Sequence, residues 1–307
     1  MIIVSIFGGL ASQMDQYSFM LALKKAYPDT RFKIDPFFSY ELVHNGYELE
    51  RVFGIKEEKA TAKEVAFVSD RIPRCIKHYK LLNILMTLKM CLFGAKDSFI
   101  TPDDPSAYYP EVFKLNPLKN YLMFGNWSHE YYRTGIEDEI IATFKFPPID
   151  DKNKEVSDSI ANTNSVSLHV RHGDYSSCGF PILPKWYYEK AIRIIQEKVD
   201  NPHFFIFSDD IEYVRREFSF LDNCTIVDWN KKEDSFRDMQ LMSMCKHNII
   251  ANSGFSYWGA RLNYKSGAIR IAPRYHISIC KHNCREGSTG WIIIDNNDIN
   301  NNELLIL

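Results

Sequence analysis

The second half of the chain alternates short apolar runs with helical patterns, and this alternation restricts the possible folds more than any other feature of the sequence. Runs typical of strands lie at 166–170, 203–207, 225–228, 248–251 and 268–272. Apolar residues at helical spacing fill the intervals 184–199, 211–218, 235–247 and 254–264. Consecutive strands joined through helices pair in parallel with right-handed crossovers. The alternation therefore predicts a doubly wound α/β domain of the Rossmann type.

The first half begins in the same way and then loses the pattern. A strand at 2–6 is followed by a glycine pair and by apolar residues at helical spacing, whereas residues 60–120 mix helix and loop signals. The best linker is at 146–153, because adjacent prolines stop a helix and polar residues follow. We therefore expect an α/β chain of two Rossmann-like domains, at 1–155 and 156–307, that face a central cleft.

The composition excludes several classes of protein. Apolar residues at 45% and charged residues at 25% are ordinary values for a globular chain, and they exclude a disordered or fibrous protein. A formal net charge of −2 gives no overall basic field, so we expect no nucleic-acid partner. The 7 cysteines, an odd number, favour free thiols in a reducing compartment, and we expect a cytoplasmic protein. Cys280, His282 and Cys284 lie close together, but their spacing is unusual for zinc, and we predict no metal site.

Polar loops follow several of the predicted strands, at the points where these strands end. The loops are Gly8-Gly9-Leu10-Ala11-Ser12-Gln13, Arg171-His172-Gly173-Asp174-Tyr175, Ser208-Asp209-Asp210 and Asn252-Ser253-Gly254-Phe255-Ser256. Open α/β sheets bind their ligands at the carboxyl ends of the strands. The loops therefore predict a binding site at these sheet edges, although any one of them alone is typical of a turn or a helix cap.

The residue types in these loops suit a nucleotide diphosphate. Arg171 offers a planar fork of donors that matches phosphate. The loop at 253–256 leads into a helix, whose free N–H groups and dipole attract an anion. Asp209 and Asp210 can accept hydrogen bonds from ribose hydroxyls or from the N–H groups of guanine. A rival interpretation is that these carboxylates hold a metal ion through the pyrophosphate.

An apolar segment at 81–93 is interrupted by polar residues and falls short of a transmembrane span. Lysines punctuate and flank it, at positions 77, 80, 89 and 96. Two interpretations remain open. The segment is either a buried helix with solvated lysines or a helix that lies on an anionic membrane surface. The second gives the protein a peripheral contact at the inner face of the cell membrane.

The polar loops given above, in their order along the chain, resemble the motifs of glycosyltransferase family 11, the α-1,2-fucosyltransferases, of the short bacterial type. The resemblance covers nearly the whole chain and is strongest in Phe7–Phe19, His169–Tyr175, Phe205–Asp210 and Asp238–Leu262. The chain departs from the family pattern at a few positions. Ala11 and Ser12 stand where the family has Gly-Asn, and Asp15 stands where it has an aromatic residue. His172 replaces the second arginine of the His-x-Arg-Arg-Gly-Asp-Tyr motif.

The resemblance implies a GT-B-like fold, GDP-fucose as the donor substrate, no cofactor and no metal. In related fucosyltransferases the first arginine of the His-x-Arg motif contacts the pyrophosphate, and this role falls on Arg171. The implied donor-binding residues are His169, Arg171, Asp209, Asp210, Asn252, Ser253, Phe255 and Ser256, with Gly8, Gly9 and Gln13 in a glycine-rich loop. Inverting transfer favours a base for the acceptor proton, and His172 and Asp174 are both candidates. Asp174 equally suits a structural acceptor for a backbone N–H.

These expectations lead to one predicted function and leave two alternatives open. We predict an inverting transferase that moves L-fucose from GDP-fucose to a galactoside hydroxyl, in α-1,2 linkage, on a surface glycan such as O-antigen or capsule. The acceptor is a galactose-containing glycan that can be lipid-linked, bound on the N-terminal side, and the C-terminal domain holds the donor. The alternatives are a transferase that uses another nucleotide sugar and a non-catalytic homologue that binds nucleotide or carbohydrate.

Overall fold

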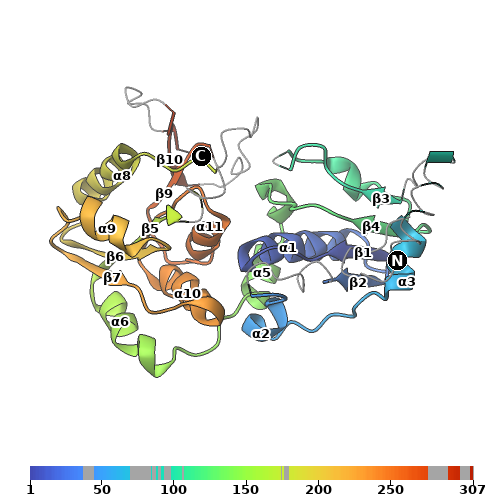
Figure 1. The fold of residues 1–307 in the computed structure, drawn as a ribbon, viewed down its shortest axis with the longest axis horizontal. Coiled ribbons are helices and arrows are strands. Elements are labelled where there is room, and N and C mark those ends of the chain that lie inside the picture. Colours follow the sequence, from blue (N-terminus) through green and yellow to red (C-terminus); the bar gives the residue numbers. More distant parts are fainter. Residues whose placement is uncertain are drawn as a thin grey trace. The chain divides into compact units, whose positions relative to one another are not determined.

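The computed structural model describes residues 1–36, 45–69, 84, 88, 91–92, 98–105, 107–173, 175, 180–275, 290–297 and 305–306. The chain divides into two compact units, Met1–Lys145 and Phe146–Leu307. Each unit is built on a largely parallel sheet with helices beside it, so the predicted α/β class is confirmed (Figure 1). The expected boundary near residue 155 lies inside helix α6 (Asp151–Asn162) and is therefore about ten residues too late. The whole helix belongs to the second unit, because its residues Val156 and Ile160 pack into the core of that unit.

The first unit contains a short parallel sheet in the order β2-β1-β4-β3. Its strands are β1 (Ile2–Ser5), β2 (Phe32–Asp35), β3 (Phe99–Ile100) and β4 (Tyr121–Met123). Its helices are α1 (Leu10–Ala26), α2 (Leu49–Phe53), α3 (Ala62–Ser69), α5 (Glu137–Thr143) and the 3₁₀ turns η3 (Pro110–Phe113) and η4 (Glu130–Arg133). The first strand and the helix after it lie where the sequence predicts them.

A buried ion pair joins α1 to η4 in this unit. The Asp15 carboxylate contacts the guanidinium of Arg133, and both side chains are almost fully buried. Arg133 also donates to the carbonyls of Ser128, at 2.9 Å, and His129, at 3.0 Å. Charges are buried in proteins when they are paired and hydrogen-bonded. Asp15, which departs from the family pattern, is therefore matched by a cation from a distant part of the chain.

The second unit contains a sheet in the order β11-β10-β9-β8-β5-β6-β7. Its strands are β5 (Asn164–Val170), β6 (Pro202–Ser208), β7 (Cys224–Val227), β8 (His247–Ile249), β9 (Arg270–Pro273), β10 (Trp291–Ile294) and the antiparallel β11 (Leu305–Ile306). Besides α6, its helices are α8 (Lys185–Lys198), α9 (Ile211–Glu217), α10 (Phe236–Met244), α11 (Gly254–Arg261) and the 3₁₀ turn η5 (Lys232–Ser235). All strands predicted between 166 and 272 are confirmed, and β10 and β11 extend the sheet beyond them.

Side-chain alternation in β6 explains why helices cover both faces of this sheet. Successive residues of a strand point to opposite faces. Phe204 and Ile206 join the apolar cluster that contains residues of α8, whereas Phe205 and Phe207 join the cluster that contains residues of α6 and α10. All these phenylalanines are buried. The strand is therefore apolar on both sides, which is typical of a parallel strand at the centre of a three-layer domain.

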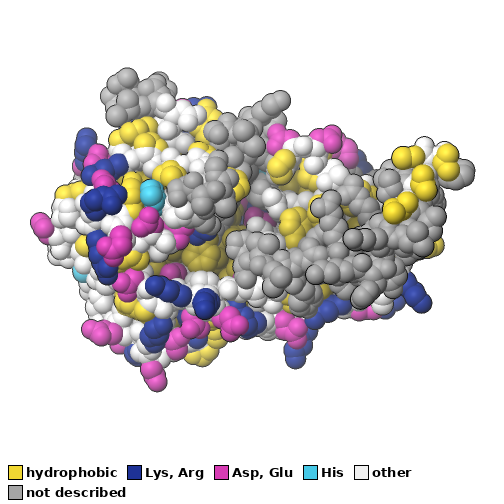
Figure 2. All heavy atoms as spheres, in the orientation of Figure 1, with side chains coloured by type: hydrophobic (Ala, Val, Ile, Leu, Met, Phe, Trp, Pro, Cys, Tyr) yellow, Lys and Arg dark blue, Asp and Glu magenta, His cyan; other side chains and the backbone are white. Residues whose placement is uncertain are grey.

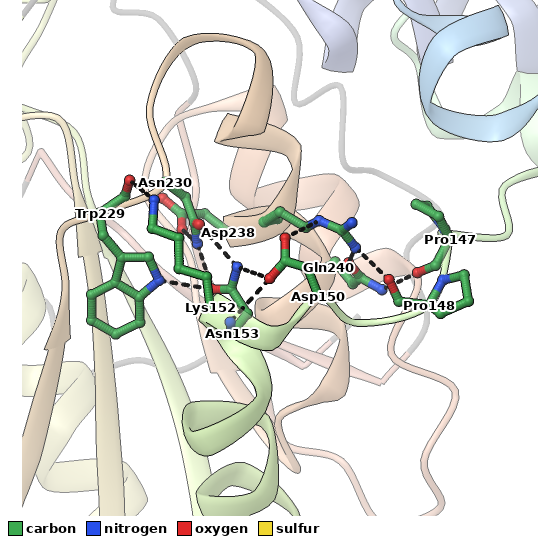
Figure 3. A network of polar contacts seen from close by, with 10 residues as sticks. Pro147, Pro148, Asp150, Lys152, Asn153, Trp229, Asn230, Asp238 and Gln240 are labelled. Atoms are coloured by element: carbon green, nitrogen blue, oxygen red, sulfur yellow. Dashed lines mark hydrogen bonds and ion pairs between the residues drawn. The ribbon is translucent and has the colours of Figure 1, made fainter.

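A polar network fixes the predicted linker to the second unit (Figure 3). The Gln240 amide donates to the Pro147 carbonyl at 2.7 Å, and Arg237 donates to the Pro148 carbonyl at 2.7 Å. Deeper in the network, the Asn230 amide donates to the Asp238 carboxylate at 2.8 Å. Burial raises the pKa of Asp238 to about 7. Pro147 and Pro148 therefore follow the end of the first unit at Lys145, and α10 holds them as part of the second unit.

The apolar segment at 81–93 is described only at Ile84, Leu88, Cys91 and Leu92, which are helical. Ile84, Leu88 and Leu92 are 56%, 53% and 75% exposed. The buried-helix interpretation is therefore wrong at these positions. None of the helices within the described residues is both long enough and apolar enough to cross a membrane. In the view of Figure 2, basic and acidic side chains are intermixed over the second unit.

Candidate functional site

The candidate site lies at the carboxyl edge of the second sheet. Strand β5 pairs with β6 on one side and with β8 on the other. The connections from β5 to β6 and from β6 to β7 progress in one direction, and the connection to β8 reverses it, so the gap between β5 and β8 is a topological switch point. Ligands of open α/β sheets bind at such points. The predicted loops after β5, β6 and β8 therefore start from neighbouring strands.

Asp209 holds the loop that follows β5. Its Oδ1 accepts the backbone N–H groups of His172, at 2.9 Å, and Gly173, at 3.1 Å. Its Oδ2 lies 3.3 Å from Nε of Arg171. A Cβ at position 173 would lie 3.2 Å from the carbonyl oxygen of Asp209, so glycine allows this close approach. The carboxylate therefore fixes the backbone that follows Arg171 and forms an ion pair with its guanidinium, whose carbon also lies 5.5 Å from the ring centre of Tyr175.

Asp210 joins the same loop to the start of α9. Its Oδ1 caps the helix by accepting the N–H of Tyr213 at 3.0 Å, and its Oδ2 lies 2.8 Å from Nδ1 of His172. The His172 ring stacks on the Tyr213 ring, with centroids 3.9 Å apart and planes inclined by 12°. The Tyr213 N–H, and to a smaller extent His172, keep the pKa of Asp210 below its usual value. His172 is therefore held by a carboxylate at its edge and an aromatic ring at its face.

The loop after β8 leads into α11, as predicted. Ser253 caps this helix, since its hydroxyl accepts the N–H of Phe255 at 3.3 Å. The Ser256 hydroxyl accepts the N–H of Ala251 at 3.2 Å. The Asn252 amide donates to the Pro181 carbonyl at 2.8 Å, and its buried Oδ1 has no partner among the residues that the structure describes. These contacts fix a helix start whose N–H groups and dipole favour an anion.

Tyr175 connects the loops after β5 and β8. Its hydroxyl donates to the Asn252 carbonyl at 3.1 Å. His169 is a buried residue near the end of β5. Its ring centre lies 6.0 Å from the ring centre of Phe255. Burial, and to a smaller extent the charge of Arg171, lower the pKa of His169 to about 3, so its ring is neutral. His169 therefore supports the edge of the site as a packed, uncharged group.

The glycine-rich loop belongs to the first unit. Gly8 has a φ of +77°, a left-handed conformation that glycine adopts without strain. The buried Gln13 amide donates to the carbonyls of Gly8, at 2.8 Å, and Gly46, at 2.7 Å, and its Oε1 accepts the N–H of Glu48 at 2.8 Å. Gly9 occupies the N-cap position of α1. Gln13 therefore fastens this loop to the segment before α2.

The structure places the predicted donor-binding residues of the second unit at one sheet edge, whereas one of the two candidate bases is not described. Asp174 lies outside the described residues. Sequence reasoning gave no role to Tyr175 or Tyr213. Tyr213 could have been found as the third residue after a helix-capping aspartate, but nothing in the sequence shows that its ring faces His172. Among the described residues, no group of three or more His, Cys, Asp or Glu side chains could hold a metal ion.

Comparison with known proteins identifies the family. Residues 101–291 match the sequence profile of glycosyl transferase family 11. The chain belongs to this family. An Escherichia coli relative of this glycosyltransferase, the O-antigen biosynthesis glycosyltransferase WbnK, is 30% identical over 288 residues, which cover 87% of this chain and 92% of the relative. An Escherichia coli alpha-1,2-colitosyltransferase is 31% identical over 284 residues, which cover 89% of this chain and 91% of the relative.

Solved structures show the same fold for this family 11 glycosyltransferase. The fucosyltransferase NodZ from Bradyrhizobium aligns with a TM-score of 0.54 and 13% identity, over 100% of this chain and 98% of NodZ. A FUT1 mutant of Arabidopsis thaliana in complex with GDP aligns with a TM-score of 0.51 and 11% identity, over 88% of this chain and 70% of FUT1. The predicted GT-B-like fold is thereby confirmed.

Proposed function

We propose that this family 11 glycosyltransferase moves L-fucose from GDP-fucose to a galactoside hydroxyl in α-1,2 linkage. The observation that carries the proposal is the Arg171 guanidinium, held by Asp209 at the switch point of the second sheet. A fixed guanidinium beside a helix start suits a pyrophosphate leaving group. Two solved structures with this fold add support, since NodZ was soaked with GDP-fucose and FUT1 was solved with GDP. The acceptor is a surface glycan such as O-antigen, in keeping with the name of WbnK.

The chemistry follows from where negative charge develops. As the bond from the anomeric carbon to the β-phosphate oxygen breaks, the electron pair leaves with GDP, and the carbon gains oxocarbenium character. Arg171 and the N–H groups at the start of α11 stabilise the growing charge on the pyrophosphate. The acceptor hydroxyl attacks from the opposite face of the sugar, which inverts the anomeric centre. The second unit therefore supplies the leaving-group side of the reaction.

A second candidate function is transfer of colitose, because the alpha-1,2-colitosyltransferase is 31% identical to this chain over 89% of its length. Release of free nucleotide from GDP-fucose and from a nucleotide-activated colitose, with and without a panel of galactosides, separates the candidates. We expect galactoside-dependent release from GDP-fucose. Release from the colitose donor alone would replace the fucose assignment, and no release from either would favour a non-catalytic binding protein.

We predict that the protein binds GDP and GDP-fucose more tightly than UDP or ADP. Each oxygen of a carboxylate has two lone pairs, so Asp209 and Asp210 can accept guanine N–H groups in addition to their contacts within the loop. Neither uracil nor adenine offers the same pair of adjacent ring and amino N–H donors. Calorimetric titration with the three nucleotides measures the preference. Equal affinity for GDP and UDP would reject the guanine assignment.

We predict that transfer persists in EDTA. The four carboxylate oxygens of Asp209 and Asp210 all contact donors on Arg171, His172, Gly173 or Tyr213. Arg171 and the start of α11 provide the positive potential that Mg²⁺ provides in metal-dependent transferases. The initial rate is compared before chelation, after it, and after Mg²⁺ or Mn²⁺ is restored. A rate that vanishes with EDTA and returns with the ion would show that the carboxylates hold a metal.

We also propose that the exposed apolar residues Ile84, Leu88 and Leu92 contact an anionic membrane leaflet. Their spacing of four places them on one side of a helix, and all three are more than half exposed. The surrounding segment, 71–96, contains no Asp or Glu and is rich in basic residues, namely Arg71, Arg74, Lys77, Lys80, Lys89 and Lys96. Apolar residues with flanking positive charge are typical of helices that lie on anionic lipid surfaces.

Sedimentation with lipid vesicles tests this contact. We expect binding to phosphatidylglycerol vesicles and weak binding to phosphatidylcholine vesicles. Changing Ile84, Leu88 and Leu92 together to serine should weaken binding by more than tenfold, because each buried side chain of this kind contributes about 1.5–3 kcal/mol. The matched control is Leu118→Ser, since Leu118 is 93% exposed elsewhere in the same unit. Equal loss in the control, or no loss in the triple variant, would contradict the contact.

A further inference from the structure

The His172 ring is held at its edge by the Asp210 carboxylate and at its face by the Tyr213 ring. We propose that His172 is the base that takes the proton from the acceptor hydroxyl, with Asp210 and Tyr213 as its positioning residues. This inference rests on the proposed function, because a base is needed only if the protein transfers a sugar to a hydroxyl. It selects one of the two bases that the sequence leaves open.

Three contacts hold His172, one at its backbone and two at its imidazole. The backbone N–H of His172 is bound by Asp209 at 2.9 Å, its Nδ1 lies 2.8 Å from Oδ2 of Asp210, and its ring lies flat on Tyr213. Asp210 is itself fixed, because its other oxygen accepts the Tyr213 N–H at 3.0 Å. A carboxylate that accepts from Nδ1 keeps the proton on that nitrogen and leaves Nε2 with a lone pair. Within the described part of the chain, Nε2 has no hydrogen-bond partner and is not enclosed.

Arg171 and His172 are consecutive residues, but their side chains contact different partners. Arg171 turns to Asp209 and Tyr175, whereas His172 turns to Asp210 and Tyr213. Consecutive residues can therefore serve the leaving group and the attacking group separately. The charged groups around the imidazole are Asp210 in direct contact, Asp209 at the loop backbone, and Arg216, whose guanidinium carbon lies 5.6 Å from the Tyr213 ring centre.

The proposed step balances without another reactant. Nε2 takes the proton of the acceptor hydroxyl while the hydroxyl oxygen bonds to the anomeric carbon. The bond from that carbon to the β-phosphate oxygen breaks, and its electron pair leaves with GDP. The imidazolium that forms is stabilised by the Asp210 carboxylate, and its proton then passes to water. A triad aspartate supports its histidine by the same chemistry.

The decisive variant is His172→Arg. A guanidinium can bind phosphate but stays protonated, so it cannot act as a base. If His172 is the base, both His172→Ala and His172→Arg should lower kcat by about 10²–10⁴-fold, the usual contribution of general base catalysis. The KM for GDP-fucose and the calorimetric affinity for GDP should stay close to wild type. Added imidazole should restore part of the rate of His172→Ala.

Variants of the positioning residues give readouts that a purely structural role would not move. Asp210→Asn keeps a good helix cap but removes the charge that stabilises the imidazolium, so we expect a lower kcat. Tyr213→Phe keeps the stacked ring and should lose less activity than Tyr213→Ala, which removes it. His203→Ala is the matched control, because His203 binds Asn223 and Thr225 away from this loop.

The outcomes separate this inference from the proposed function. If His172→Arg keeps near-full turnover, or His172→Ala keeps kcat and only weakens donor binding, His172 is a phosphate ligand and the inference is overturned while the function stands. If the wild-type protein transfers no sugar from GDP-fucose or from the colitose donor, both are overturned. Wild-type transfer with loss of kcat in both His172 variants and rescue by imidazole supports both.

Discussion

Replacing Arg171 with alanine is expected to lower the transfer rate by about 10²–10³-fold, the usual cost of removing one preorganised donor from a site where charge develops. The guanidinium lies at the end of β5 beside Asp209 and the ring of Tyr175, with 23% of the side chain exposed, so its loss removes charge without opening the core. Arg171→Lys should restore little, because an ammonium lacks the planar fork that binds phosphate at two points.

The measurement is kcat/KM for GDP-fucose, with thermal unfolding as a check on folding. Arg193→Ala is the matched control, since Arg193 is an exposed arginine on α8. We expect all three proteins to unfold at similar temperatures and only the Arg171 variants to lose activity. Near-full turnover in Arg171→Ala would show that another group binds the pyrophosphate.

Replacing Asp209 with alanine is expected to lower the rate by about 10²-fold, since a displacement of roughly 1 Å in a catalytic group can cost that much. The change leaves the N–H groups of His172 and Gly173 without their acceptor and removes the carboxylate beside Arg171. The loop then loses the contacts that aim Arg171. Asp209→Asn should lie between wild type and alanine, because its side-chain oxygen can still accept the N–H groups while the charge is gone.

Turnover with GDP-fucose, together with the affinity for GDP, measures this effect. The control is Asp222→Ala, an exposed aspartate before β7. Activity in Asp209→Ala equal to that of the control would mean that the loop keeps its geometry without the carboxylate. It would also remove the structural basis for treating Asp209 as the residue that positions Arg171.

Much of the second unit could be predicted because its strands and helices alternate with clear periods. The runs around Val166–Val170 and His203–Phe207 are apolar enough for central strands, and the helices between them are amphipathic. The sequence does not predict β10, although Trp291–Ile294 is fully apolar, because no helical pattern precedes it. In the first unit, β3 has two residues and β4 three, which is too short for a period to be recognised.

The parallel topology also brought the donor loops together, since it places the carboxyl ends of β5, β6 and β8 side by side. The partners of individual side chains could not be predicted in the same way. Asp209 and Asp210 were expected to face a nucleotide, and each also binds groups within the protein. Asp15 and Arg133 are 118 positions apart, and only the folded chain shows that they form a pair. Sequence patterns predict which edge carries the chemistry, whereas the positions of donors and acceptors depend on tertiary packing.

The activity that we propose for this family 11 glycosyltransferase is formation of an α-1,2-fucosyl galactoside from GDP-fucose. Its most direct test is to isolate the product formed from GDP-fucose and a terminal galactoside, and to determine the added sugar by mass spectrometry and the linkage by NMR. We expect one added fucose, attached in the α configuration to O2 of galactose. Incorporation of colitose but not fucose, or attachment at another hydroxyl, would contradict it.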